Sequence, residues 1–403
     1  MLINDPVHGF IEIAEGMIET LVRHPYFVRL HRIKQLGPTA YVYPGGQHTR
    51  FAHSIGALHL ITNALRVLQH KGCDISEDEA EAAKAAMLLH DIGHGPMSHC
   101  LEGIFVRTAS HEQLTLLLME QLDAELGGAL AMAIEIFRDT YPKHFLHELI
   151  CSQLDMDRLD YLCRDSFFAG VREGNIGAER IIKMLNVKDD RLVVEAKGIY
   201  TIENYLMARR LMYWQVYLHK TALAAQETLA AVMERANELV ARGVQLPASS
   251  SLAYFLYNKV DLEYMRRNPE AIRNYTMLDD SDIITALKEW TTNDDRVLSI
   301  LASYYIDRHL YKARELSAPL SAAQLKEIEQ IVALRLGIAP EDTHYFVRPR
   351  RVSQMLYSTA DDHICVLMKD GAVRDISNFS ELLHSEMVDR RSERNYLFTP
   401  RCP

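Results

Sequence analysis

Three histidines and one aspartate fall within ten residues of the chain, in the stretch His90-Asp91-Ile92-Gly93-His94-Gly95-Pro96-Met97-Ser98-His99. An apolar helical segment, residues 85–89, leads into this stretch, and a Gly-Pro turn lies within it. A buried imidazole or carboxylate is costly unless it is paired or bound to a metal ion. The density of these groups behind an apolar segment therefore favours a metal or catalytic site over a surface cluster. Eleven of the 18 histidines lie in residues 1–111, which points to more imidazole ligands in that part.

A metal ion also needs ligands from other segments, because one short stretch rarely surrounds it. Upstream, the candidates are His48 and His53; downstream, they lie in residues 154–165. Helical spacing in that downstream segment predicts one polar face, made of Asp157, Tyr161, Arg164 and Asp165. Periodicity alone leaves a solvated face and a face that lines a cavity about equally favoured.

Most of the chain has the apolar spacing of helices, and Ser76 and Ser110 each begin a capping box. The predicted helices cover about 57–70, 77–93, 111–126, 146–166, 176–186, 202–241, 281–290, 295–310 and 321–336. The stretch 202–241 has neither proline nor glycine, so we expect one long uninterrupted helix there.

Strand patterns are few, and most lie near the end of the chain. Strands are predicted at 191–195, 345–347 and 364–368, and an Asp-Gly turn leads from the last of these into 372–374. The expected fold class is therefore mostly α, with a helical core over residues 1–311 and a small α+β C-terminal subdomain over residues 312–403.

Composition excludes several classes of protein. A chain of 403 residues with 48% hydrophobic and 24% charged residues is not broadly disordered. A net charge of -10 argues against broad coating of nucleic acid, but it allows an anionic ligand in a local basic pocket. The six cysteines form no CxxC pair, and neither a signal peptide nor an apolar run of membrane-spanning length is visible, so a cytoplasmic protein without a membrane partner is expected.

Several further motifs accompany the 90–99 stretch in a fixed order. They are Asn4-Asp5-Pro6-Val7-His8-Gly9, Ile33-Lys34-Gln35-Leu36-Gly37, Arg50-Phe51-Ala52-His53-Ser54, His111-Glu112 and Asp157-Arg158-Leu159-Asp160-Tyr161. In this order and spacing the set resembles the HD superfamily of metal-dependent phosphohydrolases. Within that superfamily it is similar to the deoxynucleoside triphosphate triphosphohydrolases, which include dGTPase-like enzymes and the catalytic core of the sterile-alpha-motif and HD-domain proteins. The resemblance is strong over about residues 1–240 and weak beyond, and it implies an HD-domain helical core.

The resemblance implies a metal site and a set of substrate contacts. The implied metal ligands are His53, His90, Asp91 and Asp157. This mixed nitrogen and oxygen set suits iron, manganese, zinc, nickel or cobalt, and Mg²⁺ can accompany the substrate phosphates. The implied catalytic residues are His111 as the proton donor to the leaving 5′ oxygen, Glu112 or Glu102 as its carboxylate partner, His94 and Arg50. The implied substrate-binding residues are Arg50, His99, Arg158 and Arg209 for the phosphates, and Gln35, Tyr161, Asp165 and Tyr217 for the sugar.

The activity implied is hydrolysis of a deoxynucleoside triphosphate to deoxynucleoside and triphosphate. One alternative is an HD phosphohydrolase that acts on other nucleotides, such as mono- or diphosphates or analogues. Another is a non-catalytic protein that senses nucleotides or binds nucleic acid, for which the basic clusters at 348–351 and 390–391 are the support. A homodimer or higher homo-oligomer is expected, since the family commonly assembles and the C-terminal piece is too small to bury a core alone. Residues 23–31 do not match the activator-binding positions of the animal enzyme, so its nucleotide regulation is not implied.

Overall fold

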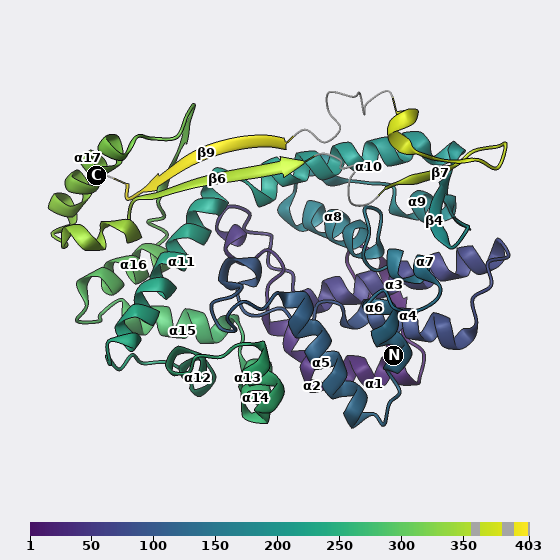
Figure 1. The fold of residues 1–403 in the computed structure, drawn as a ribbon, viewed down its shortest axis with the longest axis horizontal. Helices are drawn as coiled ribbons and strands as arrows, with labels where there is room; N and C mark the ends of the chain where they lie inside the picture. The colour runs from purple at the N-terminus through teal and green to yellow at the C-terminus, as the bar shows by residue number, and fades with distance from the viewer. Residues whose placement is uncertain (356–362, 381–390, 402–403) are drawn as a thin grey trace.

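The structure is a computed structural model, and it describes residues 1–355, 363–380 and 391–401 (Figure 1). The side chains of Ser98, His99, Gln354, Met355 and Arg391 fall outside the description. The fold class is mostly α, as the sequence predicts. Within the described residues, no helix has the length and apolar character needed to cross a membrane.

Five helices build the part of the fold that carries the site: α3 (Arg50–His70), α4 (Glu77–Leu89), α5 (His111–Glu125), α8 (Met156–Ala169) and α11 (Lys220–Ala241). The other α-helices are α1 (Met17–Arg23), α2 (Pro25–Val28), α6 (Ala131–Phe137), α7 (His144–Glu148), α9 (Ala178–Met184), α10 (Ile199–Met212), α12 (Ser250–Tyr257), α13 (Leu262–Arg267), α14 (Pro269–Met277), α15 (Asp280–Trp290), α16 (Arg296–Ile306) and α17 (Ala322–Leu336). The capping boxes predicted at Ser76 and Ser110 are both formed, and they begin α4 and α5.

Helix α3 is the centre of this arrangement, because it packs against both α4 and α8. Gly56 lets α8 approach closely. A Cβ atom at Gly56 would lie 2.0 Å from Asp160 Oδ1 and 2.2 Å from Arg164 Nη2. Both atoms belong to fully buried side chains of α8, so no side chain larger than hydrogen fits at this crossing.

The strands form three small sheets. An N-terminal hairpin pairs β1 (Leu2–Asp5) with β2 (Gly9–Glu12). A four-stranded sheet has the order β3 (Leu185–Lys188), β4 (Arg191–Glu195), β7 (Cys365–Leu367) and β8 (Val373–Asp375), with β4 and β7 parallel. An antiparallel sheet has the order β5 (Lys312–Leu316), β9 (Arg391–Thr399) and β6 (Arg348–Met355), and Figure 1 shows β6 and β9 side by side as a long ribbon.

The strands expected at 191–195, 364–368 and 372–374 are confirmed as β4, β7 and β8. The strand expected at 345–347 is wrong, because a 3₁₀ helix occupies Pro340–Tyr345 and the strand begins at Arg348. Strand β7 pairs with β4 of the helical core. The C-terminal part therefore shares a sheet with the core, and the division at 311/312 stays a prediction.

The expectation of one helix over 202–241 is wrong. Helix α10 ends at Met212, a π-helical turn covers Tyr213–Tyr217, and α11 starts at Lys220 with His219 as its N-cap. The Tyr217 hydroxyl donates to Asp165 Oδ2 at 2.7 Å. This tertiary contact stabilises the interruption between the two helices, which contains neither proline nor glycine. Such π-turns often occur at functional sites.

The helix expected over 146–166 is also interrupted. Helix α7 ends at Glu148, and α8 starts at Met156. The carboxylate of Asp155 accepts hydrogen bonds from Arg158 N at 2.6 Å and Ser152 N at 2.9 Å. A side-chain oxygen that accepts a hydrogen bond from a backbone N–H of the first helical turn is an N-cap. Asp155 therefore ends the loop between α7 and α8 and determines where α8 begins.

Candidate active site and metal centre

Four side chains from three helices converge at one buried point. His53 lies in the first turn of α3, His90 and Asp91 follow the end of α4, and Asp157 lies in the first turn of α8. His53 Nε2 is 3.3 Å from His90 Nε2 and 3.0 Å from Asp157 Oδ1. His90 Nε2 is 3.5 Å from Asp91 Oδ1 and 3.6 Å from Asp157 Oδ1. His53, His90 and Asp91 form a group whose ligand atoms all lie within 4.8 Å of one another.

The outer nitrogen of each imidazole shows which atom is free for a metal ion. His90 Nδ1 contacts the Met87 carbonyl oxygen at 2.6 Å, and His53 Nδ1 contacts Asp160 Oδ2 at 2.8 Å. Both partners are acceptors, so each Nδ1 carries the proton. In the neutral form of each ring, Nε2 then has the lone pair that a metal ion could take in exchange for a proton. This donor set fits a divalent cation, and outer partners of this kind are typical of histidine ligands.

The electrostatics of the cluster agree with that fit. Burial lowers the pKa of His53, but the hydrogen bonds and charges of Asp157 and Asp160 outweigh burial and raise the pKa to about 10. Burial raises the pKa of Asp157, but His53 and His90 more than offset this effect and hold it below the usual range. The carboxylates thus create a strongly negative potential that favours positive charge at this point.

A cavity of about 430 Å³ adjoins the cluster. Its lining includes Gln35, Arg50, Asp91, His94, His111, Asp157, Arg158, Tyr161, Asp165, Tyr213 and Tyr217. Most of the side chains that the sequence assigned to catalysis or substrate binding therefore lie on one surface. Tyr213 also lines the cavity, although the sequence did not suggest it as a site residue. It lies in the π-helical turn, which helical periodicity does not predict.

His111 lies beside the cluster and has a carboxylate partner. Its Nδ1 contacts Glu102 Oε1 at 2.9 Å, and its backbone N–H donates to the same oxygen at 2.8 Å. Its ring stacks on His94 with a centroid separation of 4.0 Å, and His94 Nε2 lies 3.4 Å from Asp91 Oδ1. Of the two glutamates that the sequence left open, Glu102 is the one for which the structure gives a contact with His111.

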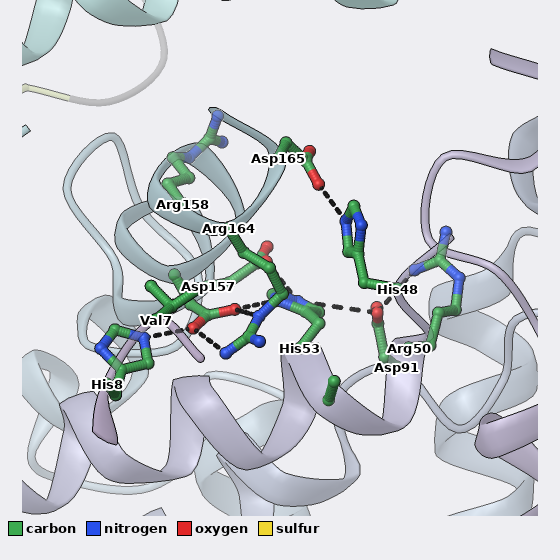
Figure 2. A network of polar contacts seen from close by, with 12 residues as sticks. Val7, His8, His48, Arg50, His53, Asp91, Asp157, Arg158, Arg164 and Asp165 are labelled. Carbon is green, nitrogen blue, oxygen red and sulfur yellow. Dashed lines mark hydrogen bonds and ion pairs between the residues drawn. The ribbon is translucent and has the colours of Figure 1, made fainter. Parts of the chain in front are cut away.

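The cavity ends in a second polar group centred on Asp165. His48 Nε2 contacts Asp165 Oδ1 at 2.6 Å, while the Tyr217 hydroxyl contacts Oδ2. His48 was a candidate metal ligand from the sequence, but the structure places it on this carboxylate instead, as Figure 2 shows. Gln35 Oε1 is buried and has no hydrogen-bond partner within the described chain, so its carboxamide oxygen is available to a ligand.

The arginines that the sequence assigned to phosphate binding have different contacts in the structure. Arg50 Nη1 donates to Asp91 Oδ2 at 2.5 Å, next to the cluster. Arg158 lines the cavity, with its Nε donating to the Ser152 carbonyl at 2.6 Å. Arg209 Nη1 donates to Gln153 Oε1 at 2.6 Å. The side chain of His99 lies outside the description, so its expected role is not placed.

The basic cluster at 348–351 is largely neutralised by acidic residues. Arg348 pairs with Glu227 and Glu234, and Arg350 also pairs with Glu227. Arg351 pairs with Glu393. Ion pairing of this kind removes most of the support that the cluster gave to nucleic-acid binding, and residue 390 of the second cluster lies outside the described ranges.

Comparison with known proteins agrees with this geometry. The HD domain family matches residues 50–165, and the HD associated region matches residues 176–246. The uncharacterized protein YwfO of Bacillus subtilis is 30% identical over 98% of this chain and 91% of its own length. The chain belongs to the HD-domain phosphohydrolases. The resemblance inferred from the motifs is thereby confirmed.

Two further relatives add detail to this family assignment. The crystal structure of a phosphohydrolase from Bacteroides thetaiotaomicron has 49% sequence identity and a TM-score of 0.96, and the match covers 100% of both chains. The human deoxynucleoside triphosphate triphosphohydrolase SAMHD1 is 29% identical over 54% of this chain and 42% of its own length. The HD-family cluster of His53, His90 and Asp91 is thus suited to a divalent metal ion in a hydrolase.

Proposed function

We propose that this HD-family protein hydrolyses deoxynucleoside triphosphates to deoxynucleoside and inorganic triphosphate. The observation that carries the proposal is the lining of the cavity beside the metal-binding cluster, because it combines cationic groups with acceptors. Arg50, Arg158 and His94 suit phosphates, whereas Gln35 and Asp165 offer acceptors to a sugar hydroxyl. The similarity to SAMHD1 supports the same substrate class.

We propose His53, His90, Asp91 and Asp157 as the ligands of the metal ion. A divalent ion held there polarises a phosphoryl oxygen and lowers the pKa of a bound water. Arg50 Nη1 donates to Asp91 Oδ2 at 2.5 Å, and Arg50 also lines the cavity. A guanidinium placed in this way stabilises the charge that grows on the phosphate nearest the sugar.

We propose that His111 protonates the leaving 5′ oxygen. Water adds its oxygen to the phosphorus nearest the sugar and releases a proton to solvent, while the bond from that phosphorus to the 5′ oxygen breaks. Nε2 of His111 supplies a proton to that oxygen and regains one from solvent after the products leave. Glu102 Oε1 contacts Nδ1 of the same ring at 2.9 Å and fixes the orientation of the ring. General acid catalysis of this kind contributes about 10² to 10⁴ in rate.

The sugar end favours a deoxyribose. Asp165 and Gln35 accept from a 3′ hydroxyl, while Tyr161 and Tyr217 pack edge to face with ring centroids 6.1 Å apart and narrow the cavity beside them. Tyr217 is fixed by its bond to Asp165 at 2.7 Å. A ribose 2′ hydroxyl would have to displace a held aromatic ring, so ribonucleotides are expected to react more slowly.

Product analysis tests the proposal. The protein is incubated with each deoxynucleoside triphosphate, ribonucleoside triphosphate and deoxynucleoside monophosphate, with Mn²⁺, Fe²⁺, Co²⁺, Ni²⁺, Zn²⁺ or Mg²⁺, in water enriched in ¹⁸O. We expect deoxynucleoside and triphosphate, with ¹⁸O in the triphosphate. Arg158→Lys, which keeps the charge, should retain more activity than Arg158→Ala. Turnover of monophosphates alone, or nucleotide binding without turnover under every metal, would show that the proposal is wrong.

We also propose that the chain forms a homo-oligomer. Helix α17 exposes Ile331 and Leu334, the latter at 86%, and an exposed apolar pair favours contact with another surface. Light scattering at micromolar protein concentration tests this, and a monomeric particle that is fully active would contradict it.

A further inference from the structure

The tip of the N-terminal hairpin reaches the metal centre from outside residues 50–165, the range that the HD domain family matches. Strands β1 and β2 pair from Leu2 to Glu12, and the turn between them is shaped by Asp5. The Asp5 Oδ1 atom accepts hydrogen bonds from the backbone N–H groups of Val7 and His8, each at 2.9 Å. This turn directs the His8 ring inward, where its side chain is only 9% exposed.

His8 and Arg164 both contact the carboxylate of Asp160. His8 Nε2 lies 2.6 Å from Asp160 Oδ1. Arg164 makes a two-pronged contact, with Nη2 3.0 Å from Oδ1 and Nε 2.9 Å from Oδ2. Arg164 also donates from Nη1 to Asp5 Oδ2 at 2.7 Å, so the guanidinium joins the hairpin tip to α8.

The third side chain on this carboxylate is His53. Its Nδ1 contacts Asp160 Oδ2 at 2.8 Å, and its Nε2 faces the cluster. Asp160 and Arg164 have fully buried side chains, and that of Asp5 is 4% exposed. Figure 2 shows His8 and Arg164 on one side of His53, with Asp91 and Arg50 on the other.

A carboxylate has about four acceptor positions, and here four N–H groups occupy them. Each oxygen of Asp160 accepts one bond from Arg164 and one from a histidine. With all four positions filled, the carboxylate has a single orientation. Removal of the His8 contact leaves Oδ1 short of a donor and lets the carboxylate turn, which changes the direction of His53 Nε2.

We propose that Asp5 and His8 are positioning residues of the metal centre, which act through Arg164 and Asp160 to fix the proton and direction of the His53 ring. This inference rests on the proposed metal site, and it extends the site to a segment 45 residues before its first ligand. Positioning of the His53 ring matters for metal binding because metal–ligand distances must be held within about 0.2 Å. Outer partners of ligating histidines change metal affinity or activity by about 10- to 100-fold.

Metal titration without nucleotide tests the inference separately from the substrate. The apparent Kd for Mn²⁺ is measured on the full chain by competition with a chelator, and Co²⁺ is used for absorption spectra. We expect His8→Ala to weaken Mn²⁺ binding at least about 10-fold and to change the Co²⁺ spectrum. His8→Gln, whose amide N–H can still donate to Asp160, should restore most of the affinity.

His59→Ala is the matched control. The His59 ring stacks on His8 with a centroid separation of 5.4 Å, and its own Nε2 contacts Asn63 rather than Asp160. This variant removes packing beside His8 but leaves the contact with Asp160, so its Mn²⁺ affinity should stay within about threefold of the parent, well short of an outer-partner effect.

Asp5→Asn provides a second route that keeps the side-chain shape. It removes the charge that faces Arg164, and we expect Mn²⁺ binding to weaken here too. Parent-like Mn²⁺ affinity and Co²⁺ spectra in His8→Ala, or in Asp5→Asn if His8→Ala does not fold, would overturn the inference. If the affinities fall as expected while no deoxynucleoside triphosphate is hydrolysed, the positioning role stands and only the proposed substrate fails.

Discussion

Gly56→Ala is the substitution for which the structure gives the clearest magnitude. The added Cβ would lie 2.0 Å from Asp160 Oδ1 and 2.2 Å from Arg164 Nη2. Contacts below 3.0 Å are essentially never seen for a real Cβ, so α3 and α8 must separate or the two side chains must move by about 1 Å, as expected of an overpacked core. Neither side chain has exposed surface into which it can turn.

The expected cost follows from the interaction that is broken. Overpacking costs about 1–3 kcal/mol, and disruption of a buried ion pair costs about 3–5 kcal/mol; because the two effects share the same atoms, we expect about 3–5 kcal/mol in all. Unfolding entropy of about 2.1 cal/mol/K per residue gives about 0.85 kcal/mol/K for 403 residues. The melting temperature should therefore fall by about 4–6 °C.

The assay is thermal unfolding followed by circular dichroism, with a chelator present and again with Mn²⁺. Because Asp160 holds His53, the Mn²⁺-dependent rise in melting temperature should also shrink. Gly177→Ala is the control, since a Cβ there would meet its nearest atom at 3.7 Å. A melting temperature of Gly56→Ala within about 1 °C of the parent, with an undiminished response to Mn²⁺, would refute the reasoning. Overpacking against a buried ion pair should lower the free energy of unfolding by more than such a small shift allows.

Three other outcomes are expected. His90→Ala and Asp157→Ala should each lose bound metal and activity while the helical circular dichroism persists, and full metal occupancy in both would contradict the ligand assignment. His111→Ala should keep metal and nucleotide binding but lose about two to four decades of turnover, measured by single-turnover kinetics. Asp295→Asn should lower the free energy of unfolding by about 1–2 kcal/mol at pH 7, because Asp295 pairs with Arg235 at 2.7 Å, and this difference should shrink in urea titrations below about pH 4.

The sign of the last prediction follows from the pKa of Asp295. Burial raises this pKa, but the hydrogen bonds from Arg235 and from the Leu298 N–H, together with the charges of Arg235 and Arg242, outweigh burial and hold it below the usual value. A carboxylate with a lowered pKa stabilises the fold above its unfolded pKa, and this stabilisation is lost as the pH falls through the folded pKa. A difference between Asp295→Asn and the parent that stays constant from pH 7 to pH 3 would contradict this assignment.

Several features could be predicted from the sequence because they depend on neighbouring residues. The capping boxes at Ser76 and Ser110 satisfy backbone groups within one turn, so they mark the starts of α4 and α5 directly. The adjacent pair His90-Asp91 after an apolar helix marked one side of the cluster for the same reason. The mostly helical class also follows from local spacing, since apolar periodicity repeats within each helix.

The breaks in the helices could not be predicted in this way. Nothing in the composition of Tyr213–Tyr217 ends a helix, and the turn forms where Tyr217 bonds to Asp165, 52 residues earlier in the chain. The strand expected at 345–347 failed for a similar reason. Tyr345 is buried at the end of a 3₁₀ turn, so its apolar character indicated burial and not an extended backbone.

The choice among like residues was decided only by tertiary structure. The residue pattern by itself offered Glu102 and Glu112 to His111, and His48 and His53 to the metal; only the family resemblance selected His53, and it left both glutamates open. Glu102 contacts His111, while His48 turns to Asp165. A side chain's partner depends on where distant helices cross, and the sequence records residue types and spacing but not those crossings. The chain alone thus determined which chemical groups are present, and the packing of α3 against α4 and α8 decided which of them meet.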